Sequence, residues 1–212
     1  MLFRIICHII VCLIDTKQRI FDFNRSDVIN SLIKKHQCKK YLEIGCDYNL
    51  NFNRINAEVK VGIDPLRGGT LRMTSDEFFG KNREMFDIIF IDGLHYAEQT
   101  HKDIVNSIKV LNDNGTIVVH DCNPENYSAQ VVPRPKWKRH WNGTVWKAWL
   151  KLKSERNDLE MFVVDVDDGV GVIRIGGQKT IKNADISYKE FEQNKKKLLN
   201  LISVEEFRDW LE

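Results

Sequence analysis

The segment Phe86–Pro124 constrains the fold more than any other part of the chain. It contains two short apolar runs separated by a stretch with helical spacing, and an acid lies at the end of each run: Asp92 and Asp121. This pattern predicts two neighbouring parallel strands that are buried on both faces. Adjacent strands lie about 4.8 Å apart, so the two carboxylates are expected to face one crevice at the carboxyl edge of a sheet. His95 and His120, close to the acids in sequence, would share that crevice.

The alternation of apolar runs and helical stretches continues on both sides of this segment. Further strands are predicted at Tyr41–Gly45 and Lys60–Asp64, and helices at about 24–37, 95–111 and 144–152. A less clear segment at 71–79 is expected to hold a short strand and then a helix. The run Leu159–Gly176 contains a turn at 167–169 and predicts an antiparallel hairpin at the end of the parallel core.

We therefore expect a single α/β domain over residues 1–212. It would comprise an apolar N-terminal segment and a helix over 1–38, a core over 40–176, and C-terminal helices over 185–212. Two capping boxes, Ser187 with Glu190 and Ser203 with Glu206, are predicted to begin those last helices. His101 and Asp103, within the predicted 95–111 helix, are expected to face solvent.

Composition excludes several classes of protein. The net charge of +2 indicates no general affinity for nucleic acid. Five cysteines without a C-x-x-C pair argue against a disulfide framework or a zinc finger and indicate a reducing, cytoplasmic location. The apolar run Leu2–Ile14 is shorter than the roughly 20 residues of a transmembrane helix. We expect it to be buried or to contact a partner, which allows a homodimer; peripheral contact with a membrane is the alternative.

Five motifs occur in a characteristic order: LEIG (42–45), GIDP (62–65), MTSDEFF (73–79), FDIIFIDGLHYAEQ (86–99) and GTIVVHDCNP (115–124). Together they resemble the class I S-adenosylmethionine (SAM) dependent methyltransferases, and among these the sugar and glycan O-methyltransferases. The resemblance implies a Rossmann-like, seven-stranded, mostly parallel sheet with an antiparallel last strand and helices on both faces. It also implies methyl transfer from SAM to a hydroxyl of a sugar or glycan.

The predicted SAM contacts lie at strand ends and in the segment after the second strand: Glu43, Gly45, Cys46, Asp64, Ser75, Asp76 and Asp92. Gly45 lets the backbone approach a ligand, and the Asp64 carboxylate can accept both ribose hydroxyls. By resemblance, Glu43 lies near the amino-acid part of SAM, and Ser75 and Asp76 border adenine. Where the family commonly has G-x-G-x-G, this chain keeps only the first glycine, at position 45.

A sugar hydroxyl must lose its proton as the methyl group arrives, so a general base or a metal is required. The predicted catalytic residues are Asp92, His95, His120 and Asp121. Asp92 and Asp121 can share one Mg²⁺ or Mn²⁺ ion; alternatively, a metal-free site uses His95 or His120 as the base.

The long loop at 122–143 holds three of the four prolines and is predicted to bind the acceptor. Its candidate contacts are Arg134, Trp137 and Trp141.

Two other functions stay open. A nucleotide-dependent sugar oxidoreductase is disfavoured because the later glycines of the first loop are missing and no suitable helix carries Tyr-x-x-x-Lys. A non-catalytic SAM-fold module is disfavoured because ionisable residues are kept at both strand ends.

Overall fold

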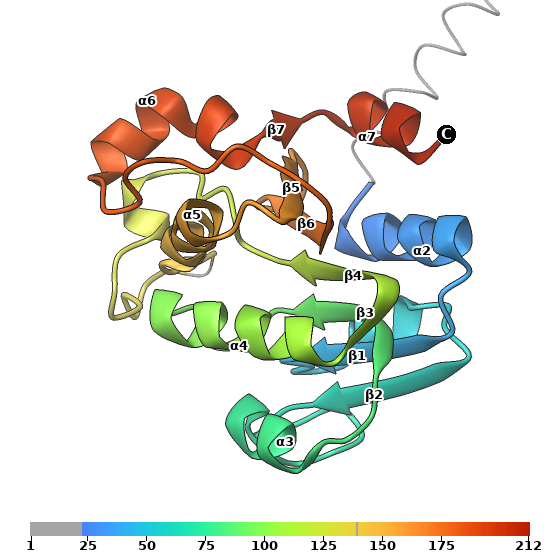
Figure 1. Cartoon of the computed structure of the whole chain (residues 1–212). Coiled ribbons are helices and arrows are strands. Elements are labelled where there is room, and N and C mark those ends of the chain that lie inside the picture. The colour runs from blue at the N-terminus through green and yellow to red at the C-terminus, as the bar shows by residue number, and fades with distance from the viewer. Residues whose placement is uncertain (1–22, 139) are drawn as a thin grey trace, which may run out of the picture.

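The computed structural model describes residues 23–138 and 140–212. Its strands form one seven-stranded sheet in the order β2-β1-β3-β4-β6-β5-β7 (Figure 1). The strands are β1 (Lys40–Ile44), β2 (Val59–Ile63), β3 (Phe86–Ile91), β4 (Leu111–Val119), β5 (Leu159–Val164), β6 (Val170–Ile175) and β7 (Leu201–Ile202). The helices are α2 (Arg25–His36), α3 (Ser75–Lys81), α4 (Ala97–Lys109), α5 (Val145–Glu155), α6 (Tyr188–Leu199) and α7 (Val204–Leu211), with short 3-10 turns η1 (Phe52–Arg54) and η2 (Tyr127–Ala129).

The sheet is mixed in the way that the sequence predicts. Strands β2, β1, β3 and β4 are mutually parallel, and β6 runs antiparallel between β4 and β5. The Rossmann-like fold class is therefore confirmed. The antiparallel strand is the last one of the 40–176 core, and the two-residue β7 follows it and pairs parallel to β5.

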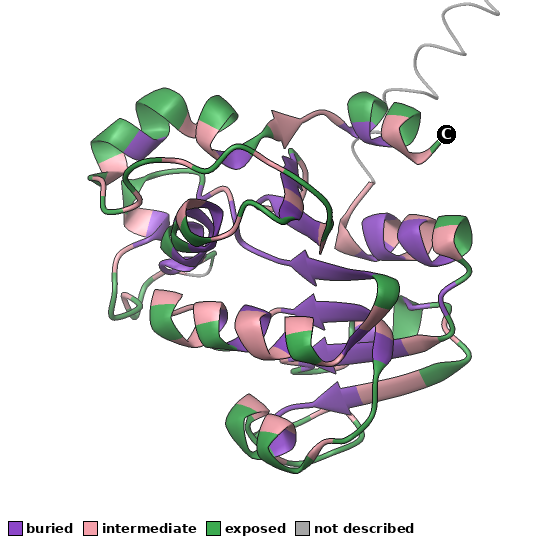
Figure 2. Ribbon diagram, viewed as in Figure 1, coloured by how far each residue is buried: buried purple, intermediate pink, exposed green. Residues whose placement is uncertain are grey.

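Side chains alternate between the two faces of the sheet and build two apolar cores. Along β3, Ile89 and Ile91 face the core shared with α3, α4, α5 and α6, whereas Ile88 and Phe90 face the core shared with α2 and α7. The central strands are buried along nearly their whole length (Figure 2). This double burial explains why their sequences read as continuous apolar runs.

Polar side chains at the helix starts explain where several helices begin. Reciprocal capping boxes occur at Asn24 with Asp27, Thr74 with Glu77, Ser187 with Glu190, and Ser203 with Glu206. In each, the first side chain accepts from a backbone N–H that the helix leaves unpaired, and the acid bonds back to the cap residue.

Three expectations need correction or remain outside the described chain. The expected short strand near 71 is only an isolated bridge between Ile63 and Leu71. Asp103 is buried rather than exposed, because it packs between α4 and α3. The apolar segment Leu2–Ile14 lies outside the described residues, so its homodimer role stays a prediction.

Within the described residues, no helix combines the length and the apolar character needed to cross a bilayer. Cys38, Cys46 and Cys122 are buried free thiols. The reducing, cytoplasmic location stays a prediction.

The C-terminal helices dock onto the sheet core through buried contacts. The Phe191 ring of α6 lies 4.4 Å from the Trp146 ring of α5, and both side chains are fully buried. The buried Lys153 ammonium donates to the carbonyl oxygens of Lys197 and Leu198 and thereby ends α6. Helix α6 thus shares its apolar core with the central sheet.

We expect Phe191→Ala to lower the free energy of unfolding by roughly 3–5 kcal/mol, because it leaves a cavity against Trp146. Urea titration should still show one cooperative transition if the chain forms the single domain over residues 1–212 that the sequence predicts. Phe79→Ala, at a partly buried ring of the same core, is the matched control and should cost less. A second transition that unfolds the tail separately would contradict the single domain.

Candidate active site

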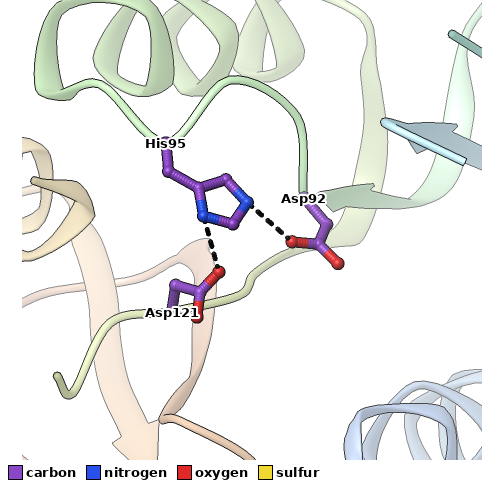
Figure 3. Close-up of side chains that lie close together, drawn as sticks. All are labelled: Asp92, His95 and Asp121. Atoms are coloured by element: carbon purple, nitrogen blue, oxygen red, sulfur yellow. Dashed lines mark ion pairs between the residues drawn. The ribbon is translucent and has the colours of Figure 1, made fainter. Parts of the chain in front are cut away.

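The imidazole of His95 lies between the two strand-end carboxylates (Figure 3). Its Nε2 is 3.3 Å from Asp92 Oδ1, and its Nδ1 is 3.1 Å from Asp121 Oδ2. The parallel ladder continues past the strands and sets this spacing: Asp92 N donates to Ile44 O, and His120 N donates to Ile91 O. The predicted convergence of Asp92, His95 and Asp121 at the sheet edge is therefore what the structure has.

Local backbone geometry brings these residues together. Gly45 has a φ of +89°, and a Cβ there would lie 2.2 Å from the carbonyl oxygen of Asp92. Only glycine lets the end of β1 approach the end of β3 so closely. Asp121 adopts the left-handed conformation with a φ of 63°, which aspartate tolerates better than most residues. The turn lets Cys122 N donate to Gly169 O, so the end of β4 meets the β5–β6 hairpin.

Arg25, at the start of α2, joins the cluster from the opposite side. Its Nη1 donates to Asp92 Oδ2 at 2.7 Å, while Nε and Nη2 donate to the two carboxylate oxygens of Asp167 at 2.7 and 3.1 Å. Asp167 lies in the turn of the β5–β6 hairpin, 142 residues away. Sequence reasoning missed both residues, because one is read as an ordinary helix start and the other as an ordinary turn.

His120 lies deeper in the cluster than His95. Its side chain is 4% exposed against 22% for His95, and its Nδ1 is 3.1 Å from Asp121 Oδ2 and 3.2 Å from Arg25 Nη1. Burial alone would lower the pKa of His120, but the charges of Asp92 and Asp121 outweigh burial and hold it well above 6.5. A proton on His120 therefore stabilises the fold below pH 6.5, and this contribution is lost as the pH rises through the raised pKa.

The same balance acts on the other members of the cluster. Burial lowers the pKa of His95, but its hydrogen bond to Asp92 and the two nearby carboxylates raise it above 6.5 overall. Burial would raise the pKa of Asp92, yet the two histidines hold it far below its usual range. Three carboxylates thus share the site with one guanidinium and two imidazoles, which offset their charge.

The end of the long loop fixes the His95 ring. The Trp141 ring stacks on it at 5.4 Å and 8°, and the Trp141 carbonyl accepts from His95 Nδ1 at 2.9 Å. Asn142 donates to Asp121 Oδ1 at 2.7 Å. Gly143 has a φ of +61°, and a Cβ there would lie 2.0 Å from the His95 carbonyl. Of this group, the sequence predicted Trp141 and missed Asn142.

The expected SAM residues at the end of β1 surround a buried carboxyl group. Glu43 is 1% exposed, accepts from Tyr41 Oη, and accepts from Asn51 Nδ2 at 2.9 Å. Burial raises the pKa of Glu43 to about 7, although both hydrogen bonds act in the other direction. Cys46 is also buried, so its contribution to a ligand is limited to its backbone.

The Asp64 carboxylate is already engaged by backbone donors. Its Oδ2 accepts from Asp47 N at 2.9 Å, and its Oδ1 accepts from Leu66 N and Arg67 N at 2.8 and 2.9 Å. A carboxylate offers about four acceptor positions, so one remains. In this arrangement Asp64 can accept one ribose hydroxyl rather than the two that were expected.

The remaining predicted residues lie away from the acid and histidine cluster. Ser75 and Asp76 begin α3, and Gln99 of α4 donates to both. Gln99 also donates to Asp103, whose pKa burial raises to about 6. Trp137 is 72% exposed, and Arg134 lies over Trp141 with its guanidinium carbon 6.0 Å from the ring centre. Trp141 is thus the one predicted acceptor residue that touches the cluster.

Three donors also fit a divalent cation. Ligand atoms of Asp92, His95 and Asp121 all lie within 4.8 Å of one another. Two carboxylates with one imidazole suit Mn²⁺ better than Mg²⁺, which prefers oxygen ligands alone. A cation here would compete with the proton on His95 and with Arg25 for Asp92.

Arg25→Met should lower the free energy of unfolding by about 2–3 kcal/mol, because Asp92 and Asp167 lose their shared partner. The cost stays below that of a fully buried pair, since 27% of the Arg25 side chain is exposed. The matched control is Arg156→Met, which breaks a two-point ion pair with Asp158 whose side chains are 31% and 56% exposed. That control should cost about 0–1 kcal/mol in denaturant titrations. Equal losses in the two variants would show that Arg25 does not hold the cluster together.

Part of the chain is similar to proteins of a known domain family. Residues 28–122 match the sequence profile of a methyltransferase domain family, and they include β1–β4 and both strand-end acids. No curated protein sequence matches the chain significantly.

Several solved structures share the fold. The SAH-bound methyltransferase PaMTH1 of Podospora anserina has a TM-score of 0.53 and 18% identity, over 71% of this chain and 77% of that one. A Staphylococcus aureus protein provisionally assigned as a caffeoyl-CoA O-methyltransferase has a TM-score of 0.56 and 17% identity, over 79% and 91%. The SAM-bound O-methyltransferase TomG of Streptomyces achromogenes, involved in tomaymycin synthesis, has a TM-score of 0.51 and 13% identity, over 72% and 80%. The match over residues 28–122 thus points to a methyltransferase domain, and the solved structures show that the chain shares the fold of SAM-dependent methyltransferases.

Proposed function

We propose that this chain is a SAM-dependent methyltransferase that acts on oxygen and methylates a hydroxyl group of a sugar or glycan, with His95 as the general base. The observation that carries the proposal is the position of His95 between Asp92 and Asp121, beside the Gly45 end of β1. The Staphylococcus aureus and Streptomyces achromogenes proteins, both described as O-methyltransferases, are consistent with it.

The hydrogen bonds of His95 determine which nitrogen takes the proton. Nδ1 faces two acceptors, the Trp141 carbonyl and the Asp121 carboxylate, so in neutral imidazole it carries the hydrogen. Nε2 then has the lone pair and accepts the proton of the acceptor hydroxyl. Asp92 Oδ1, 3.3 Å from Nε2, stabilises the imidazolium that forms. His120 is too buried to meet an acceptor, and we assign it a positioning role.

Bound SAM supplies an electrophilic methyl group on its sulfonium. The residues that would hold it are the backbone of the Gly45 loop, the remaining acceptor position of Asp64, and Glu43 beneath the loop. Ser75 and Asp76, 11 and 12 positions after Asp64, remain the proposed adenine contacts. The resulting oxygen nucleophile would form beside that methyl group, because Gly45 and Asp92 are in van der Waals contact.

The direct test is to incubate the protein with SAM and a panel of neutral and charged glycans. A mass gain of one methyl group on a sugar hydroxyl supports the proposal. Calorimetric binding of SAM without any methylated sugar would be consistent with a SAM-dependent methyltransferase. It would refute a sugar or glycan as the methyl acceptor.

His95→Ala should lower kcat by about 10²–10⁴-fold, because the proton has no acceptor, and leave SAM affinity nearly unchanged. His101→Ala is the matched control: this histidine lies on α4 and pairs with Glu155 at 2.8 Å, away from the cluster. In the wild type, methyl transfer should increase with pH through a value above 6.5, because the raised pKa keeps His95 protonated below it. Full turnover in His95→Ala would show that another group accepts the proton of the acceptor hydroxyl.

The divalent cation proposed for Asp92 and Asp121 has its own test. If it takes part, a chelator should abolish turnover and Mn²⁺ should restore it, since the cation would polarise the acceptor hydroxyl. Asp92→Asn and Asp121→Asn should then resist rescue. Unchanged turnover in the chelator would leave His95 as the activating group.

A further inference from the structure

The chain contains one long stretch without a single acidic residue. Residues 126–154 have no aspartate or glutamate and hold seven lysines and arginines, although the whole chain has 30 acids in 212 residues. Four of the seven are concentrated in the long loop, at positions 134, 136, 138 and 139. This part of the molecule is therefore strongly basic although the net charge of the chain is only +2.

Both ends of this loop are held rigidly, and its tip (residues 132–138) projects from them. Asn142 N and Gly143 N both donate to Ala129 O, and Trp141 Nε1 donates to Val131 O at 2.7 Å. The tip is closed on itself, because the Arg134 guanidinium donates to Lys138 O at 3.1 and 3.2 Å. Lys138 Nζ donates to Ser128 Oγ at 2.9 Å and ties the tip to η2.

The tip reaches the proposed catalytic base through one aromatic ring. Trp141 stacks on His95, and the Arg134 guanidinium lies over the same Trp141 ring. The positive charge of the tip thus lies next to the ring that contacts His95 rather than at a remote surface.

Two lysines of the tip are not paired with carboxylates in the part of the chain that the structure describes. Among the described residues, neither Lys136 nor Lys138 forms an ion pair with an acid. Asp92 and Asp121, on either side of His95, are already compensated by Arg25 and the two histidines. Trp137, between the two lysines, exposes 72% of its surface and offers a flat apolar ring to a ligand.

From these observations we propose that the tip binds a phosphate group of the acceptor, so that the substrate is a phosphate-bearing carbohydrate. This inference rests on the proposed function. Lys136, Lys138 and Arg134 supply the charge-assisted hydrogen bonds that phosphate oxygens accept. The phosphate at the tip leaves a sugar hydroxyl to reach His95 beneath Trp141.

A small phosphorylated ligand fits these observations better than a nucleic acid. Binding along a nucleic-acid backbone needs basic residues along an extended surface, and its strength grows with the number of phosphates contacted. Here Lys136 and Lys138, which form no ion pair with an acid among the described residues, lie only two positions apart. The phosphate can belong to a simple sugar phosphate or to a nucleotide-activated sugar, whose base would stack on Trp137.

Calorimetric titration of the full chain with UDP, inorganic pyrophosphate and uridine tests the proposal. UDP and pyrophosphate should bind, and uridine should bind at least about tenfold more weakly, because it lacks the phosphates. Lys136→Glu should weaken UDP binding by about tenfold or more and leave SAM affinity unchanged. Lys179→Glu, at an exposed position after β6, makes the same change in net charge and should have little effect.

The Trp137→Ala variant distinguishes a nucleotide-activated sugar from a simple sugar phosphate. If UDP binds more tightly than pyrophosphate and this variant removes the difference, the acceptor is a nucleotide-activated sugar. Equal binding of both supports a simple sugar phosphate.

Three results would overturn the inference. The first is absence of UDP and pyrophosphate binding in a protein that binds SAM, which leaves the proposed methyl transfer intact. The second is an equal effect of Lys179→Glu, and the third is tighter, Lys136-dependent binding of a uridine oligonucleotide. Failure of the wild-type protein to bind SAM would instead refute the proposed function itself.

Discussion

The site depends on charge compensation inside a largely buried cluster. Asp92, Asp121 and Asp167 converge on a volume where isolated carboxylates would be too costly to desolvate. Arg25 and the two histidines make the cluster possible, and in doing so they attach α2 and the β5–β6 hairpin to the ends of β3 and β4. The same interactions raise the pKa of His95, so the stability of the site and the protonation of its proposed base cannot be changed independently.

Local and periodic signals were sufficient to predict the fold and part of the site. Apolar runs in β3 and β4 mark strands buried on both faces, and residues at the ends of neighbouring parallel strands must be close, so Asp92, His95, His120 and Asp121 were accessible from sequence. Arg25 and Asp167 were not, because their contact joins residues 142 positions apart and leaves no periodicity. Asp103 was misjudged because its burial depends on how α3 packs against α4, which a helical pattern within one segment does not reveal.

The long loop combines two tasks that the sequence separates only weakly. Its prolines and basic residues indicated an acceptor loop, but the pattern did not distinguish Trp141, which holds His95, from Trp137, which is exposed. Gly143 explains why Trp141 reaches His95. Only its left-handed backbone allows the chain to pass over the His95 carbonyl and place Trp141 on the imidazole ring. One end of this loop orients His95 through Trp141, and the Arg134 guanidinium of its basic tip lies over the same ring.

The first loop shows how a motif can lose its glycines and keep its backbone. At the second and third glycine positions of G-x-G-x-G this chain has Asp47 and Asn49, and both adopt the left-handed conformation with φ values of 43° and 63°. Aspartate and asparagine tolerate this conformation better than other side chains, so the turn survives their presence. Their side chains then do what glycine cannot: Asn49 Oδ1 accepts from Gly69 N at 2.7 Å, and Asp47 pairs with Arg67 at 2.8 Å. Together with the backbone bonds of Asp64, these contacts fasten the loop after β2 onto the loop after β1. The missing glycines therefore leave a first loop that is braced by its neighbour, and the backbone donors leave one acceptor position free on Asp64.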